Sequence, residues 1–424
     1  MAFAQKKPID HSVYDTWESL GTKQFSNDGN WAAYSINQQE GDANLFFQHS
    51  LTAQKIKVSR GAAPGGLGGG SPLFSPDSKF AAFSIKPWYK DTRLAKIKKK
   101  KPDDMTKDTL GIANLTTLAV TKIPRVKSFK FPENGTALLA YNLEKAVDTA
   151  KKRPTSPATE SKNDDLGYFA DDEPVSAAKE GTDLILKNLT TGVERTFKYV
   201  TDYSFSKDGK KMIYAASGSK KDKTAQQGVF LLNTETGVVK TLVKGRGNFK
   251  SFTFDEESEH LAFLGETSPE KAEIKEFNIY YNSLTLDTAQ ILVDKDIVGM
   301  PQKYAVSGDG RINFSKDGNR LFFGIAPIKK PKDTTLIDFE NAKLDIWGYK
   351  DDYLQSMQLK NVDRESRKNY LSVIEIYGDP KIVPLTDVKL PDATLVNEGN
   401  AAFVLASTDY GNRIPSQWMA GSLR

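Results

Sequence analysis

One short pattern recurs along this chain and limits its possible folds more than any other feature. An aromatic or apolar residue is followed by a polar turn containing Asp, Asn or Gly, and then by a run of apolar and aromatic residues. Asp-Gly and Asn-Gly tolerate positive φ and permit tight reversals, so each copy predicts a β-hairpin. The copies occupy residues 25–36, 74–85, 131–141, 205–214, 254–263, 314–323 and 396–405.

A second hairpin is predicted after each copy but the last. Its two strands are joined by a turn that often contains Thr or Gly, as at 190–192 and 235–237. Each period therefore supplies four antiparallel strands in about 40–60 residues, which is typical of a propeller blade. A β-sandwich lacks this regular two-hairpin period, and β-helix periods are much shorter. These second hairpins are expected at 45–58, 110–123, 183–197, 228–243, 279–293 and 370–385.

The length of the chain agrees with a ring of small sheets. A single core stops growing beyond about 250–300 residues, whereas this chain has 424. A blade that cannot bury both faces alone can do so between two neighbours. We therefore expect an all-β chain: a β-propeller of four-stranded antiparallel blades over residues 7–424, with about seven blade repeats and the last one incomplete. Residues 1–6 are expected to be a tail left from a signal peptide.

Two segments interrupt the repeat and are predicted to be loop insertions. Residues 92–108 are basic and polar, and residues 145–182 are rich in Lys, Asp, Pro and Ser. Such compositions cannot bury enough apolar surface to order themselves, so we expect the second insertion to be mobile. The basic run 96–101 is followed at once by Asp103 and Asp104, which favours a solvated loop over a site for an anionic partner.

Composition excludes several classes of function. The chain has no cysteine, so it has no disulfide and no thiolate site. Its 59 basic and 54 acidic residues are nearly balanced, which gives no general case for nucleic acid as a partner. No stretch approaches the ~20 apolar residues needed to span a bilayer. Ala2 and Ala4 before Gln5 resemble the end of a secretory signal, although an ordinary N-terminus could also contain them.

No catalytic constellation is evident in the sequence. The pentapeptide Gly-x-Ser-x-Gly of serine hydrolases is absent, and its nearest approximation, 305–310, is predicted to be a loop. The three histidines, His11, His49 and His260, are scattered and lack the spacing of a zinc site. We expect His49 to be an exposed strand residue and His260 to be packed or at the surface. We therefore predict no catalytic, cofactor-binding or metal-binding residues and expect no cofactor.

Three other features have structural explanations. The Gly-rich segment 62–70 lacks the Gly-Lys-Ser/Thr ending of a phosphate-binding loop and is predicted to be a flexible connection. The acidic pairs 164–165 and 171–173 lack the alternating spacing of a calcium loop, although an acidic pair on a propeller could hold a substrate's amino terminus. The turn aspartates are predicted to form turns: Asp28, Asp77, Asp208 and Asp317.

Three longer stretches carry a resemblance to a known family. They are 7–15 (KPIDHSVYD), 86–93 (KPWYKDTR) running into 98–104, and 344–355 (LDIWGYKDDYLQ). With the repeat, they resemble the N-terminal propeller of the prolyl oligopeptidase family of serine peptidases, in particular the exported members of Bacteroidetes-type bacteria. The likeness extends from about residue 7 to residue 418.

The resemblance implies a function. In that family a C-terminal α/β-hydrolase domain carries the Ser, Asp and His, and none of those positions has a counterpart here. The chain is therefore expected to be inactive alone and to gate and filter peptides for a hydrolase domain missing from it. Its implied partners are peptide substrates and that domain, and its implied location is periplasmic or secreted. A stand-alone periplasmic protein-binding propeller remains the alternative, and an enzyme working from a central pocket would need convergent acids or histidines.

Overall fold

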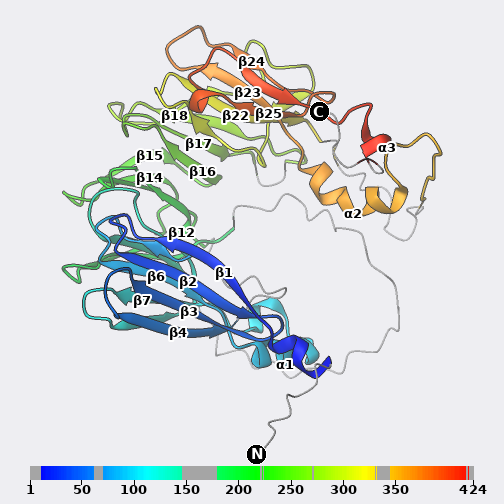
Figure 1. Ribbon diagram of the computed structural model, residues 1–424. Coiled ribbons are helices and arrows are strands. Elements are labelled where there is room, and N and C mark those ends of the chain that lie inside the picture. The colour runs from blue at the N-terminus through cyan, green and yellow to red at the C-terminus, as the bar shows by residue number, and fades with distance from the viewer. Residues whose placement is uncertain are drawn as a thin grey trace, which may run out of the picture.

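Antiparallel sheets are the main regular structure of the described residues (Figure 1). The computed structural model describes residues 11–61, 70–145, 179–219, 222, 224–269, 272–329, 331, 344–416 and 419, and every structural statement refers to these. The first sheet contains β1 (Glu18–Phe25), β2 (Trp31–Gln38), β3 (Asp42–His49) and β4 (Lys55–Gly61). The second contains β5 (Leu73–Phe74), β6 (Phe80–Ile85), β7 (Thr109–Asn114) and β8 (Val120–Pro124).

The next two units share one strand and form a continuous seven-stranded sheet. It contains β9 (Val126–Lys130), β10 (Leu138–Leu143), β11 (Thr182–Asn188), β12 (Glu194–Phe205), β13 (Lys211–Ala216), β14 (Gly228–Asn233) and β15 (Val239–Lys244). The register of β12 shifts at Val200 on its β11 side and between Val200 and Asp202 on its β13 side. The first half of β12 thus closes one four-stranded unit, and its second half opens the next.

The remaining strands form three sheets. One contains β16 (Asn248–Phe254), β17 (Leu261–Glu266), β18 (Asn278–Asn282) and β19 (Gln290–Val293). The following one contains β20 (Tyr304–Val306), β21 (Asn313–Phe314), β22 (Arg320–Pro327), β23 (Tyr370–Glu375) and β24 (Ile382–Pro384). The last contains only β25 (Asp392–Leu395) and β26 (Val404–Ser407).

Strand pairing confirms both kinds of predicted hairpin. The recurring turn joins β1 to β2, β5 to β6, β9 to β10, β12 to β13, β16 to β17, β21 to β22 and β25 to β26. The second hairpin joins β3 to β4, β7 to β8, β11 to β12, β14 to β15, β18 to β19 and β23 to β24.

Alternating side chains show how the sheets pack. On β17, Leu261 and Phe263 belong to the core shared with the preceding unit, whereas Ala262 and Leu264 belong to the core shared with the following sheet. Successive strand residues point to opposite faces, so both faces of the sheet are buried. The same alternation occurs on β6 and β13, and five such cores connect the first six units in chain order.

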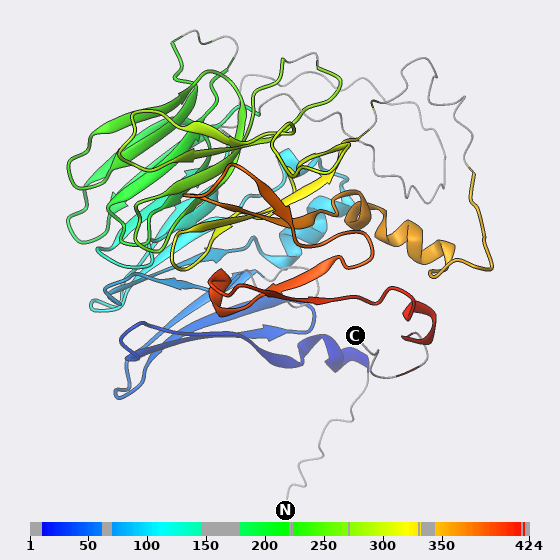
Figure 2. The same ribbon diagram turned by 90° about the horizontal axis from the view of Figure 1, so that it is seen from above.

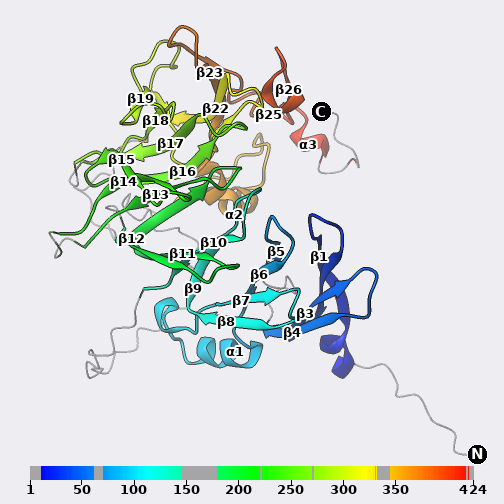
Figure 3. The same cartoon turned by 90° about the vertical axis from the view of Figure 1, so that its left-hand side faces the viewer.

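Sheets stacked face to face in this way form the arc of a β-propeller. Figure 3 shows the units following one another around a common centre, with the first sheet and the last hairpin at the two ends of the arc. Within the described residues, β1 pairs only with β2 and β25 only with β26, so no sheet pairing joins the two ends. Side chains at both ends remain exposed, including Trp17 and Phe25 at the first and Phe403 and Leu405 at the last.

Helices occur only in the connections. η1 (His11–Thr16) precedes the first sheet, α1 (Tyr89–Ile97) and η2 (Pro102–Asp104) lie between β6 and β7, α2 (Gln355–Ser366) lies between β22 and β23, η3 (Asn397–Gly399) lies in the last hairpin, and α3 (Arg413–Ser416) follows β26. In Figures 1 and 2, α2 and α3 lie at the opposite end of the sheets from the recurring turns, such as the turn between β1 and β2. None of the described helices has the length and apolarity to cross a bilayer.

The expected loop at 92–108 is wrong in its first part. α1 covers 89–97, because Arg93, Leu94, Ala95 and Lys96 are all strong helix formers. The helix buries no residue, and the lysines that follow it are exposed, as a solvated segment requires. Of the second predicted insertion, residues 146–178 lie outside the described part of the chain, as do 62–69 of the Gly-rich segment.

Candidate binding cavity at the centre of the sheets

A serine and an aspartate build the recurring turn in the same way in four of its seven copies. In the first copy, Ser26 Oγ donates to Asp28 Oδ1 at 2.6 Å and accepts a hydrogen bond from the Trp31 amide at 2.9 Å. The Asp28 carboxylate in turn accepts from the Asn30 amide at 3.0 Å. The same bonds recur at Ser75 and Asp77, at Ser206 and Asp208, and at Ser315 and Asp317. The prediction that these four aspartates form turns is confirmed.

These bonds favour the charged form of the carboxylates. The hydrogen bond from Ser315 holds the pKa of the Asp317 carboxyl below its ordinary value. At Asp208, burial alone would raise the pKa, but the bonds from Ser206 and from the Lys210 amide, together with nearby lysines, lower it. In the fifth copy Asp255 stands where these four copies have Ser, and it accepts directly from the amides of Glu259 and His260.

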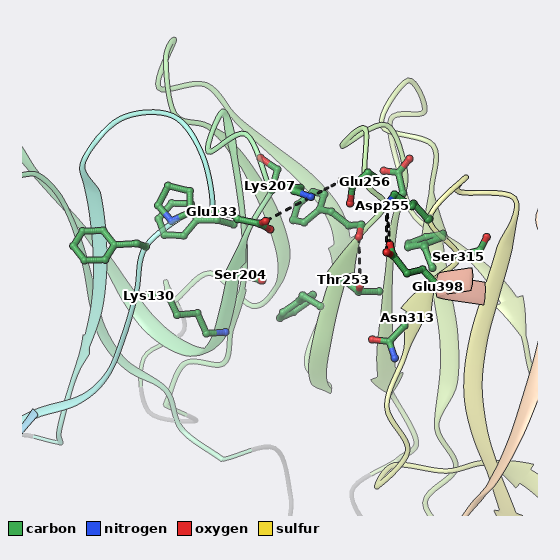
Figure 4. A pocket seen from close by; sticks show the side chains of 18 of the residues that line it. Lys130, Glu133, Ser204, Lys207, Thr253, Asp255, Glu256, Asn313, Ser315 and Glu398 are labelled. Atoms are coloured by element: carbon green, nitrogen blue, oxygen red, sulfur yellow. Dashed lines mark hydrogen bonds and ion pairs between the residues drawn. The ribbon is translucent and has the colours of Figure 1, made fainter. Parts of the chain in front are cut away.

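The turns and the strands before them surround a central cavity of about 520 Å³. Its lining comes from β5, β9, β12, β16 and β21, which each enter the recurring turn, and from Glu398 in the last turn (Figure 4). The residue before the motif's first aromatic residue lines the cavity in each of these strands. These lining residues are Leu73, Lys130, Ser204, Thr253 and Asn313.

The cavity wall is polar, but most of its polar groups are neutral or already have a partner. Lys130 donates to the Tyr203 carbonyl at 2.6 Å, and its ammonium lies 5.0 Å from the centre of that ring. Ser204, Thr253 and Asn313 contribute hydroxyl and amide groups, which both donate and accept. The wall can therefore hydrogen-bond a polar backbone without selecting for a charged side chain.

Charged residues surround the mouth of the cavity. Lys207 pairs with Glu256 and lies 3.5 Å from Glu133, and Lys316 pairs with Glu398 at 3.1 Å (Figure 4). The bond to Glu256 raises the pKa of the Lys207 ammonium, and the same bond lowers that of the Glu256 carboxyl.

His260 lies at the junction of two sheets, not in the cavity lining. It is buried, and its Nδ1 and Nε2 are 2.7 Å and 2.8 Å from the hydroxyls of Tyr281 and Tyr377. Both ring nitrogens are thus occupied by tyrosine hydroxyls and not by a serine. Burial raises the pKa of Tyr281 to about 12, which keeps this hydroxyl protonated at neutral pH.

The other residues considered from sequence lie apart from the cavity lining. His49 ends β3, is half-buried, and its Nδ1 accepts from the amides of Leu51 and Thr52. His11 is exposed in η1. The predicted loop at 305–310 is strand at its start, because Ala305 and Val306 belong to β20. The acidic residues 164–165 and 171–173 lie outside the described residues.

No metal site is found in the described part of the chain, where no group of three or more His, Asp or Glu could hold an ion. The cavity residues themselves were not predicted from the sequence. The repeat carried the necessary signal, because aligning its copies places Lys130, Ser204, Thr253 and Asn313 at one position. Their convergence depends on the ring, which alignment alone does not show.

Comparison with known proteins finds similar structures but no matching sequence family. No protein-family model and no curated protein sequence matches the chain. Among solved structures, it is similar to the β-propeller domain of the Trilobed protease from Pyrococcus furiosus, at 12% identity over 90% of this chain and 87% of that chain, with a TM-score of 0.38. A prolyl endopeptidase matches at 13% identity over 90% of this chain and 44% of that chain, with a TM-score of 0.39.

The tricorn protease matches at 12% identity over 92% of this chain and 32% of that chain, with a TM-score of 0.39. The chain thus spans less than half the length of the prolyl endopeptidase and tricorn protease chains. Scores this low carry no argument, so the fold described above rests on strand pairing and on the cores between sheets.

Proposed function

We propose that this chain is the non-catalytic propeller of a prolyl-oligopeptidase-type serine peptidase. In this role it limits which peptides reach a hydrolase domain that is not among these 424 residues. The observation that carries the proposal is the polar central cavity, on which five inner strands converge. The three stretches that resemble the exported, Bacteroidetes-type members of the family add support, and on the same resemblance we propose a periplasmic or extracellular location.

The size of the cavity suits a filter for unfolded peptides. Binding pockets for small ligands measure about 300–1,000 Å³, and the cavity of about 520 Å³ falls in that range. An extended peptide advances about 3.3 Å per residue and is narrow, whereas a folded domain of 100 residues has a radius of gyration of about 13 Å. Ser204, Thr253 and Asn313 can hydrogen-bond a passing backbone, which would otherwise lose its water partners.

The test compares three proteins on blocked peptides of graded length that carry a chromogenic group after proline. The 424-residue chain alone is expected to release no chromophore. The full product of the gene is expected to cleave short peptides and to spare folded proteins. A version lacking residues 7–424 is expected to lose this discrimination.

Two results would contradict the proposal. One is hydrolysis by the isolated chain that survives repurification. The other is a reading frame in which no hydrolase follows residue 424, which would favour the stand-alone binding propeller instead.

A further inference from the structure

One position of the recurring turn carries charges of alternating sign around the arc. It is the variable residue that precedes the turn's Asp or its equivalent. From the third turn to the seventh, this position is occupied by Glu133, Lys207, Glu256, Lys316 and Glu398. Each charge therefore has opposite charges on the neighbouring turns.

The structure brings the charges of three neighbouring pairs of turns into contact, and those of the fifth and sixth turns close enough to interact electrostatically. Lys207 lies between two carboxylates, bonded to Glu256 and 3.5 Å from Glu133. Lys316 adds favourable electrostatic interaction with Glu256 and forms an ion pair with Glu398 at 3.1 Å. Lys207 is only 29% exposed, so its two interactions are less screened than those of a fully solvated pair.

Backbone contacts hold two pairs of these turns close enough for the charges to meet. The Asn134 amide donates to the Lys207 carbonyl at 2.8 Å, and the Lys316 amide donates to the Glu398 carbonyl at 3.1 Å. The five charged residues are not part of the apolar cores between the sheets, whereas the neighbouring Phe205, Phe254 and Phe314 pack against those cores. Polar interactions between the charged residues therefore add to the geometry that the cores provide.

The first two turns do not take part in this alternation. Their equivalent positions are Asn27 and Pro76, joined by a neutral bond of 3.4 Å from the Asn27 side-chain amide to the Pro76 carbonyl. The charged series thus covers one continuous side of the mouth, and the neutral side borders the unpaired ends of the arc.

We propose that Glu133, Lys207, Glu256, Lys316 and Glu398 form an electrostatic latch that holds the third to seventh turns around the cavity mouth, and that the mouth widens when the latch is broken. The proposal of a latch is argued from the contacts within this chain. Its consequence, that the latch controls how readily a peptide enters the cavity, rests on the proposed function.

The test measures the width of the mouth directly. Because the chain has no cysteine, T136C and A402C create the only two thiols for spin labels, on the exposed surface of the third and seventh hairpins. Pulsed electron–electron double resonance then gives the distance between the two spin labels. In the K207E background, which places three carboxylates in a row, we expect a longer mean distance and a broader distribution than in the parent.

Reversing all five charges provides the decisive comparison. The variant E133K/K207E/E256K/K316E/E398K keeps every opposite-charge contact and is expected to restore the parent distance. The matched control is K240E, which breaks a similar ion pair of 3.2 Å to Asp287, a residue outside the cavity lining, and is expected to leave the distance unchanged. If K207E does not fold, K207Q replaces it, with a smaller lengthening expected.

The dependence of the spin-label distance on ionic strength is a second, independent test in the parent protein. Raising ionic strength from ~0.01 M to ~1 M shortens the screening length from about 30 Å to about 3 Å. The parent distance should therefore lengthen, whereas that of K207E should shorten, because salt screens the repulsion between its three carboxylates. An unchanged distance in K207E or K207Q, or an equal change in K240E, would overturn the latch. A distance that responds as expected, in a protein whose full product shows no peptide filtering, would uphold the latch and refute the proposed function.

Discussion

In four of the recurring turns, one serine hydroxyl makes several hydrogen bonds at once. Ser75 is completely buried, and its Oγ donates to Asp77 at 2.6 Å while accepting from the Phe80 amide at 3.0 Å. The serine thus satisfies a buried backbone donor and orients the carboxylate that caps the next amides. The turn's shape depends on this pair of side chains as well as on the glycine that commonly follows.

We expect S75A to lower the free energy of unfolding by about 1–3 kcal/mol, because it leaves the buried Phe80 amide without its acceptor. Urea denaturation followed by fluorescence measures the change. The control is S50A at an exposed position, expected to change stability by less than about 0.5 kcal/mol. Equal stability of S75A and the parent would show that the hydroxyl contributes nothing to the turn.

The turn carboxylates also make stability depend on pH. The folded-state pKa of Asp208 is lowered, so its contribution is fully present above the ordinary value of 3.8 and is lost as pH falls through the folded-state value. We expect D208N to be less stable than the parent at neutral pH, with a difference that shrinks as acid is added. Unfolding curves of both proteins between neutral and acidic pH measure it, and a difference that grows in acid would contradict the assignment.

At the scale of elements, the last hairpin differs from its counterparts. The strands that occupy the same place as β26 in the other sheets are largely buried, with Phe263 and Phe323 at 0% exposure, whereas Leu405 on β26 is 68% exposed. Polar bonds attach the hairpin to the preceding sheet instead. Arg320 Nη1 donates to the carbonyls of Gly399 and Ala401, at 3.2 Å and 2.7 Å.

We expect R320A to release this hairpin without unfolding the other sheets. Amide exchange within 392–407 should accelerate by about tenfold, because two charge-assisted bonds worth on the order of 1.4 kcal/mol together would be lost. Hydrogen–deuterium exchange with mass spectrometry resolves the segment. R367A, at an exposed residue after α2, serves as the control and should leave the exchange rate of 392–407 unchanged.

At the scale of the whole molecule, each sheet packs only against its neighbours. The core between the first two sheets contains Phe47, which is 0% exposed and lies 5.3 Å from Phe83 between ring centres. A different core connects the second sheet to the third unit. Stability in such an array is close to a sum of sheet and interface contributions, and damage at one interface should stay local.

We expect F47A to cost about 3–5 kcal/mol and to raise amide exchange within 18–124 far more than within 248–293. Exchange measured on the intact chain tests this. Equal acceleration in both segments would show that the arc unfolds as one cooperative unit.

Patterns in the sequence were enough to predict the repeat, the two kinds of hairpin and the role of the turn aspartates. These features are local, because Asp-Gly turns and short apolar runs act over a few residues. The sequence-based prediction was wrong at 92–108, where helix formers such as Leu94 and Ala95 outweighed the charge on which the loop prediction was based.

Which residues meet at the centre depends on how the sheets are arranged in three dimensions. Lys130, Ser204 and Asn313 are far apart in sequence and line one cavity because successive sheets stack around a common centre. Lys207 forms an ion pair with Glu256 on the next turn for the same reason. The physical cause is that burial of both faces of every inner sheet fixes the angle between neighbours, and no local propensity contains that angle.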